Sequence, residues 1–158
     1  MIDAAVRITH LVFAAVWAGS VVYVALVVLP LARDGAFNTT RPLEALSGKL
    51  TTISRVSAVV LLVTGGHLAG TGYTIGENGQ GLFTSINGQL VLLMVALWLV
   101  LAALVEIGAK RFESGLNGKK IREPARSALS VFRAGAVVAV ALLVVAGLIT
   151  TGVAIRYT

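Results

Sequence analysis

One apolar stretch near the start of the chain limits what the sequence can fold into. It runs from Ile8 to Leu31 and contains no Asp, Glu, Lys or Arg. About 20 apolar residues are enough for an α-helix to cross the hydrocarbon core of a bilayer. The stretch therefore predicts a membrane-spanning helix. A polar side chain inside it, that of His10, is expected to face protein, a ligand or water rather than lipid.

The rest of the chain has the same character. Hydrophobic residues make up 57% of its 158 residues, whereas soluble domains are about 45–50% apolar. We expect spans at about 4–31, 53–73, 87–108 and 133–155, which fill residues 1–158 as a single membrane domain. The predicted fold class is all-α integral membrane, an antiparallel up-down bundle of four transmembrane helices.

Composition excludes several classes of function. The chain has no cysteine, which excludes disulfides, zinc–thiolate sites, iron–sulfur clusters and covalently attached haem. Its net charge of +6 is typical of some nucleic-acid-binding proteins. Here, however, the positive residues lie in the segments between apolar runs, where they set membrane orientation. We therefore expect the lipid bilayer, and no nucleic acid, as a partner.

The positive residues predict how the chain sits in the cell (plasma) membrane. Four Lys and Arg lie between Arg33 and Arg55 and seven between Lys110 and Arg133, eleven of thirteen in all. Because cytoplasmic loops carry the excess of Lys and Arg, loops 32–52 and 109–132 are expected inside the cell. Both termini are then extracytoplasmic. Residues 42–52 and the segment from Glu123 are expected to form short helices ahead of their spans.

The two histidines are predicted to lie at one depth. His10 and His67 are each about six residues from the outer end of a span, roughly 9 Å at 1.5 Å per residue. Two imidazoles that face each other across a bundle can bind the iron of a b-type haem from both sides. The pair predicts a haem b site near the extracytoplasmic side, with both histidines as metal ligands. Electron transfer, or an accessory role in a redox complex, is the expected function.

Neighbouring side chains would complete such a site. Small residues leave room for a flat macrocycle, aromatic rings pack against its edge, and an arginine pairs with a propionate. The candidates are, in that order, Gly66 and Gly70 with the adjacent Gly65, then Phe13 and Trp17, and Arg7.

Packing alone explains the same residues equally well. His67 can bond Thr64 or Thr71, and the GxxxG spacing of Gly66 and Gly70 is typical of close contact between helices, in the chain, in a homo-oligomer or in a larger membrane complex. In this alternative the chain is a non-catalytic accessory subunit.

Other polar residues near the spans have more than one interpretation. Four polar side chains near the level of the histidines would hydrogen-bond to haem propionates or to a quinone head group, or would serve only as helix caps and interface contacts. Glu106, in the third span, is expected to pair with Lys110 four residues on rather than to relay protons. The four residues are Asn87, Gln89, Thr150 and Thr151.

Copper is the competing ligand. Cu(I) favours thiolate and thioether, and the chain offers no Cys and only Met1 and Met94.

Several short motifs occur in the first two predicted spans. They are His10, Trp17, Gly19, Tyr23 and Leu29-Pro30-Leu31 in the first, and Ser54-Arg55-Val56-Ser57 and Thr64-Gly65 in the second. Over about half of the chain these motifs resemble the CopD family, which groups copper-resistance membrane proteins with HemJ-type protoporphyrinogen oxidases.

The resemblance implies a small helical bundle, a haem or copper bound by His10, and redox or metal-handling work, including copper transport. A lysine that the HemJ-type enzymes use in a later helix has no counterpart inside a predicted span.

Overall fold

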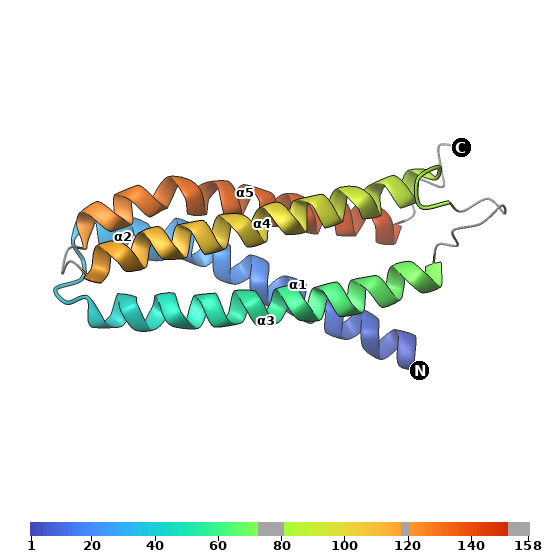
Figure 1. The fold of residues 1–158 in the computed structure, drawn as a ribbon, viewed down its shortest axis with the longest axis horizontal. Coiled ribbons are helices and arrows are strands. Elements are labelled where there is room, and N and C mark those ends of the chain that lie inside the picture. The colour runs from blue at the N-terminus through green and yellow to red at the C-terminus, as the bar shows by residue number, and fades with distance from the viewer. Residues whose placement is uncertain (73–80, 118–120, 152–158) are drawn as a thin grey trace.

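The protein is an all-α bundle of four long helices (Figure 1). The structure, a computed structural model, describes residues 1–72, 81–117 and 121–151, and within these ranges it contains no strand. The first helix comprises α1 (Ile2–Tyr23), η1 (Val24–Val28) and α2 (Leu29–Asp34). The others are α3 (Arg41–Gly72), α4 (Ile86–Asn117) and α5 (Arg122–Thr151).

The four helices alternate in direction along the bundle. Helices α1 and α4 begin at the end where α3 and α5 finish, which we call the terminal end (Figure 1). The first helix and α4 end, and α3 and α5 begin, at the opposite end, which we call the basic end (Figure 1). In the described part of the chain all four helices are long and apolar enough to cross a membrane. The predicted fold class and the multi-pass membrane character are confirmed.

The prediction of long loops at residues 32–52 and 109–132 is wrong. Only 35–40 and 118–121 separate helices there, and the segments expected as short separate helices are continuous with α3 and α5. Pro42 and Pro124 do not interrupt them because each stands in a first turn, where proline is tolerated. Helices of 32 residues are about 48 Å long and exceed a hydrocarbon core of about 30 Å. The predicted span ends at Tyr73 and Ile155 lie outside the described residues.

The first helix contains one irregular turn, and a glycine ends it. Pro30 has no N–H, and its ring crowds the carbonyl four residues back. Just before it the helix widens into a π-helical turn, in which the N–H of Leu29 donates to the carbonyl of Val24. The helix stops at Gly35, whose φ of 88° is left-handed. The N–H of Ala36 then donates to the carbonyl of Leu31 at 3.0 Å, which closes the helix end.

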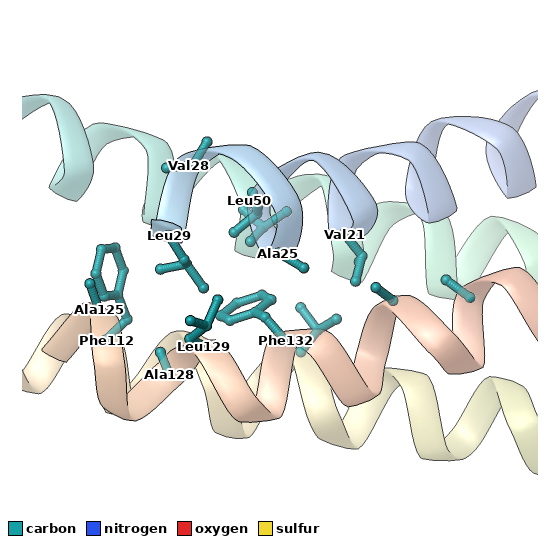
Figure 2. Close-up of a cluster of buried hydrophobic side chains, with 14 of the residues drawn as sticks. Val21, Ala25, Val28, Leu29, Leu50, Phe112, Ala125, Ala128, Leu129 and Phe132 are labelled. Carbon is teal, nitrogen blue, oxygen red and sulfur yellow. The ribbon is translucent and has the colours of Figure 1, made fainter. Parts of the chain in front are cut away.

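Buried apolar side chains are concentrated toward the basic end. Figure 2 shows Ala25 and Leu29 of the first helix facing Leu129 and Phe132 of α5. Their spacing of three or four residues gives each helix one apolar stripe. By contrast, the apolar residues of α4 from 86 to 100 are half-buried or exposed. The terminal end is therefore the loosely packed end of the bundle.

Three polar side-chain pairs join α1 to α3. The α1 members are spaced seven residues apart, which places them on one face of the helix. The pairs are Trp17 Nε1 to Ser54 Oγ at 2.9 Å, His10 Nδ1 to Thr64 Oγ1 at 2.7 Å, and His67 Nε2 to Asp3 Oδ1 at 3.0 Å.

An ion pair joins α3 to α4. Arg55 donates from Nε to Oε1 of Glu106 at 2.7 Å and from Nη2 to Oε2 at 3.0 Å. The prediction that Glu106 pairs with Lys110 is therefore wrong, because the side chain that binds its carboxylate comes from the neighbouring helix. A two-pronged pair of this kind fixes the relative position of the two helices.

The Trp17–Ser54 bond predicts different costs for two tryptophan substitutions. Trp17 is 1% exposed, so Trp17→Phe leaves the Ser54 hydroxyl buried without its donor. We expect the free energy of unfolding to fall by about 1–3 kcal/mol, measured by denaturant or thermal unfolding in detergent. Trp98→Phe is the matched control, because Trp98 Nε1 is buried and has no hydrogen-bond partner in the described structure. An equal loss in both variants would contradict the role given to the bond.

Candidate functional site

A cavity of about 270 Å³ lies in the terminal half of the bundle, and residues of α1, α3, α4 and α5 line it. It is partly open to the outside. Most of its lining is small or aliphatic, with Arg7, His10, Met94 and Thr150 as the side chains that carry polar or sulfur atoms. An apolar cavity with a few converging donors and acceptors is the usual form of a small-molecule or cofactor site.

The imidazole of His10 is held in one orientation. Its Nδ1 lies 2.7 Å from the hydroxyl oxygen of Thr64, and that hydroxyl donates to the backbone carbonyl of Val60 at 2.7 Å. A hydroxyl has a single proton. Because this proton goes to Val60, Thr64 can only accept from His10. In this arrangement Nδ1 carries the imidazole proton and Nε2 keeps a free lone pair; if the hydroxyl donates to Nδ1 instead, the proton is on Nε2.

This arrangement is typical of a histidine prepared to bind a metal. Histidine ligands generally donate their second N–H to a protein oxygen, which fixes the tautomer and the ring orientation. His10 is half-buried and lines the cavity. Its neutral Nε2 is thus the best ligand atom at this site.

Gly65 allows His10 to lie close against α3. A Cβ atom built on Gly65 would be 3.1 Å from Cε1 of His10 and 3.7 Å from Nδ1. A methyl group there would push the ring away from Thr64. The glycine adjacent to the cavity therefore has a specific steric role.

His67 lies in different surroundings. Its Nε2 bonds Asp3 at 3.0 Å, the two side chains are 41% and 70% exposed, and His67 is absent from the cavity lining. Gly65 and Ala69, each two residues away, do line the cavity, and two residues are a turn of about 200° around a helix. His67 is therefore turned out of the cavity lining, and its side chain is directed to Asp3 of α1.

The structure does not bring the two imidazoles together at the cavity. His10 is level with Thr64, whereas His67 lies about one turn nearer the terminal end, beside Asp3. Ligation by both histidines stays a prediction. It would require His67 to leave Asp3 and turn around α3.

The other predicted site residues divide into two groups. Arg7 lines the cavity together with His10. Phe13 packs against the hydrophobic core, and Trp17 is buried in it, so neither is part of the lining. Gly66 and Gly70 are exposed, and a Cβ on either would meet nothing within 4 Å. The GxxxG pair makes no close helix contact within the described residues.

The structure places three residues that the sequence analysis named in other roles. Thr64 orients His10, although the sequence indicated it as a partner of His67. Met94 of α4 lines the cavity, and Asn87, two turns before it, has a buried Oδ1 atom without a partner. Asn87, Val91 and Met94 are spaced so that they share one helix face.

A metal site built from several carboxylate or histidine side chains is not formed. In the described ranges no group of three His, Cys, Asp or Glu residues lies close enough to hold a metal ion. A haem differs from such a site because it needs only one or two axial side chains.

Comparisons with known proteins leave the family open. No protein-family model matches the chain, and searches of curated proteins and of solved structures also gave no match. The resemblance to the CopD family therefore stays a hypothesis from sequence motifs.

Two adjacent glycines give a test of the His10 geometry. Gly65→Ala puts a methyl group against the imidazole, so we expect the Nδ1–Thr64 bond to lengthen and the histidine ¹⁵N signals of the detergent-solubilised protein to shift. Gly66→Ala is the control, since its methyl group enters open space and alanine favours helix formation by about 1 kcal/mol over glycine. Unchanged His10 signals in Gly65→Ala would contradict this close contact.

Proposed function

We propose that the chain is a membrane haem protein that binds b-type haem at the terminal-end cavity through His10. It would transfer electrons or serve as an accessory subunit of a redox complex. The observation that carries the proposal is the imidazole of His10, which lines a cavity while its Nδ1 atom is bonded to the Thr64 hydroxyl.

The surroundings of His10 suit this cofactor in three respects. The lining is mostly apolar, which suits the faces of a macrocycle. Gly65 leaves open the space beside the ring. Arg7, at the same cavity, supplies a positive charge for a propionate. When bound, haem supplies one-electron chemistry, and the protein sets its potential through the axial ligands and their hydrogen bonds.

The size of the cavity makes copper the second candidate. About 270 Å³ is slightly below the range of about 300–1,000 Å³ for small-molecule sites, so a macrocycle would also have to occupy the open side. A copper ion held by His10 needs less space, as in a CopD-like copper permease. A colourless purified protein that contains copper by metal analysis would favour this candidate.

Two further partners fit particular groups. The unpartnered Oδ1 of Asn87 would accept a hydrogen bond from a quinol hydroxyl. The exposed face with Gly66 and Gly70 would suit a second copy or a larger complex, which is the role of an accessory subunit. Neither group by itself selects a function.

We also propose that the chain lies in the cell membrane with both termini and the cavity on the extracytoplasmic side. The support is the concentration of Lys and Arg near the basic end of the bundle.

The haem proposal predicts a specific spectrum. Full-length protein purified in detergent should show a Soret band, and sharp α and β bands after dithionite reduction. His10→Ala should remove these bands because the iron loses its ligand. Thr64→Val should weaken haem binding about 10–100-fold, as second-shell changes do. Size-exclusion elution controls for folding. A His10→Ala variant that keeps the low-spin spectrum would exclude His10 as a ligand, and a colourless wild type without haem affinity would end the proposal.

The orientation predicts unequal labelling of two introduced cysteines. The chain has no cysteine of its own, and Asn38 and Thr84 are exposed at opposite ends of the bundle. In intact cells a membrane-impermeant maleimide should label Thr84→Cys and leave Asn38→Cys unlabelled until the cells are lysed. The reverse pattern would place the cavity on the cytoplasmic side.

A further inference from the structure

We infer that Arg126 and Arg133 of α5 bind the head group of an anionic phospholipid, whose acyl chain lies along the same face of the helix. Both arginines are exposed near the basic end of the bundle. The inference involves neither His10 nor the cavity, so it stands or falls independently of the proposed haem function.

One exposed face of α5 changes from cationic to apolar along its length. Its members are three or four residues apart, which places them on a single stripe of the helix, and all of them are exposed. A phospholipid presents matching groups in the same order, a phosphate followed by an acyl chain. From the basic end, the stripe consists of Arg126, Ser130, Arg133, Val137, Val140, Val144 and Leu148.

The edge of the hydrocarbon core falls where the arginines give way to valines. Helix α4 has no charged residue in the 20 residues from Ile86 to Val105, which rise about 30 Å, the thickness of a hydrocarbon core. Its first charged residue is Glu106. A Cβ built on Gly108 would lie 2.8 Å from Cε2 of Phe132, so these two positions are level. Because α4 and α5 are antiparallel (Figure 1), Glu106 is level with the residues just after Arg133.

The dimensions of the stripe fit one lipid leaflet. From Val137 to Leu148 the helix rises about 16 Å at 1.5 Å per residue, and half of a hydrocarbon core is about 15 Å. Arg126 and Arg133 are about 10 Å apart along the axis, and their long side chains can bring both guanidinium groups to the level of one phosphate. A guanidinium group binds phosphate oxygens through two parallel N–H bonds.

The two guanidinium groups are available for such a ligand. Between side chains of the described residues, ion pairs are formed by Arg33, Arg55 and His67, and neither Arg126 nor Arg133 takes part in one. Arg122, one turn before Arg126, adds a third positive charge. Its guanidinium lies against Gly35 at the end of the first helix, where a Cβ would be 2.5 Å from Nη2.

The test compares the two arginines with a matched lysine. Full-length wild type, Arg126→Gln/Arg133→Gln and Lys49→Gln are purified in mild detergent, and their affinities for phosphatidylglycerol and phosphatidylcholine are measured by native mass spectrometry. Lys49 is exposed and lies eight residues into α3, between the depths of the arginines, which lie four and eleven residues into α5. We expect the wild type to prefer phosphatidylglycerol. The double variant should lose about 30-fold in that affinity, about 5-fold for each charge, and Lys49→Gln should match the wild type.

Several results would overturn the inference. An equal loss in Lys49→Gln would mean that the lipid responds to diffuse charge rather than to a site on α5. Equal binding of the two lipids by the wild type would mean that the phosphate charge is not recognised. Competition by glycerol 3-phosphate as effective as that by phosphatidylglycerol would indicate a site for a soluble phosphate. If the double variant does not fold, the single variants replace it, and a loss in neither would exclude both arginines.

Discussion

The bundle depends on the rule that a polar side chain in an apolar environment needs a partner. In the apolar stretch of α1 the side chains of His10 and Trp17 both find hydroxyl groups on α3. An unsatisfied polar group in hydrocarbon costs several kcal/mol. These bonds therefore fix the register between the two helices, because sliding by one residue would break both. The register in turn brings Gly65 against His10 and leaves Nε2 beside the cavity.

The buried apolar core is concentrated at the basic end because that end extends into water, whereas the rest of the bundle lies in lipid. Residues near the basic end extend past the predicted spans, where water makes the burial of Leu, Ala and Phe favourable. Within lipid that driving force is largely absent, and helices associate through close packing and hydrogen bonds. The buried cluster of α4 and α5, with Phe112 and Phe132, accordingly lies at the basic end. The stable end can hold the bundle together while the terminal end keeps a cavity.

The features that the sequence could predict are those that depend on the composition of a local segment. Four apolar runs were sufficient for the fold class, and one polar residue in the first run was sufficient to select His10. The loops were wrong because positive charge was taken as a sign of a loop, although long amphipathic helices also carry it past the membrane surface. Residues 41–52 are helical, and Leu43 and Leu50 are buried there on one stripe.

At the site, the sequence could not give the register between helices. Equal distance from a span end placed His10 and His67 at one depth, but it ignored which face of α3 each residue occupies. His67 lies two residues after Gly65, and this offset of about 200° around the helix turns its side chain away from the cavity lining. The same missing information hid the Arg55–Glu106 pair, which joins two helices.

Glycines that look alike in the sequence of α3 have different surroundings in the structure. Gly65, Gly66 and Gly70 look alike in the sequence, and together they suggest tight packing. In the structure only Gly65 has a side chain where its Cβ would be, and that side chain is the imidazole of His10. If the patch served helix packing alone, a neighbouring helix would be expected against Gly66 and Gly70, yet a Cβ on either meets open space. Within the described chain, the glycine that is sterically required is the one beside the candidate ligand, which favours a site at His10 over a general packing motif.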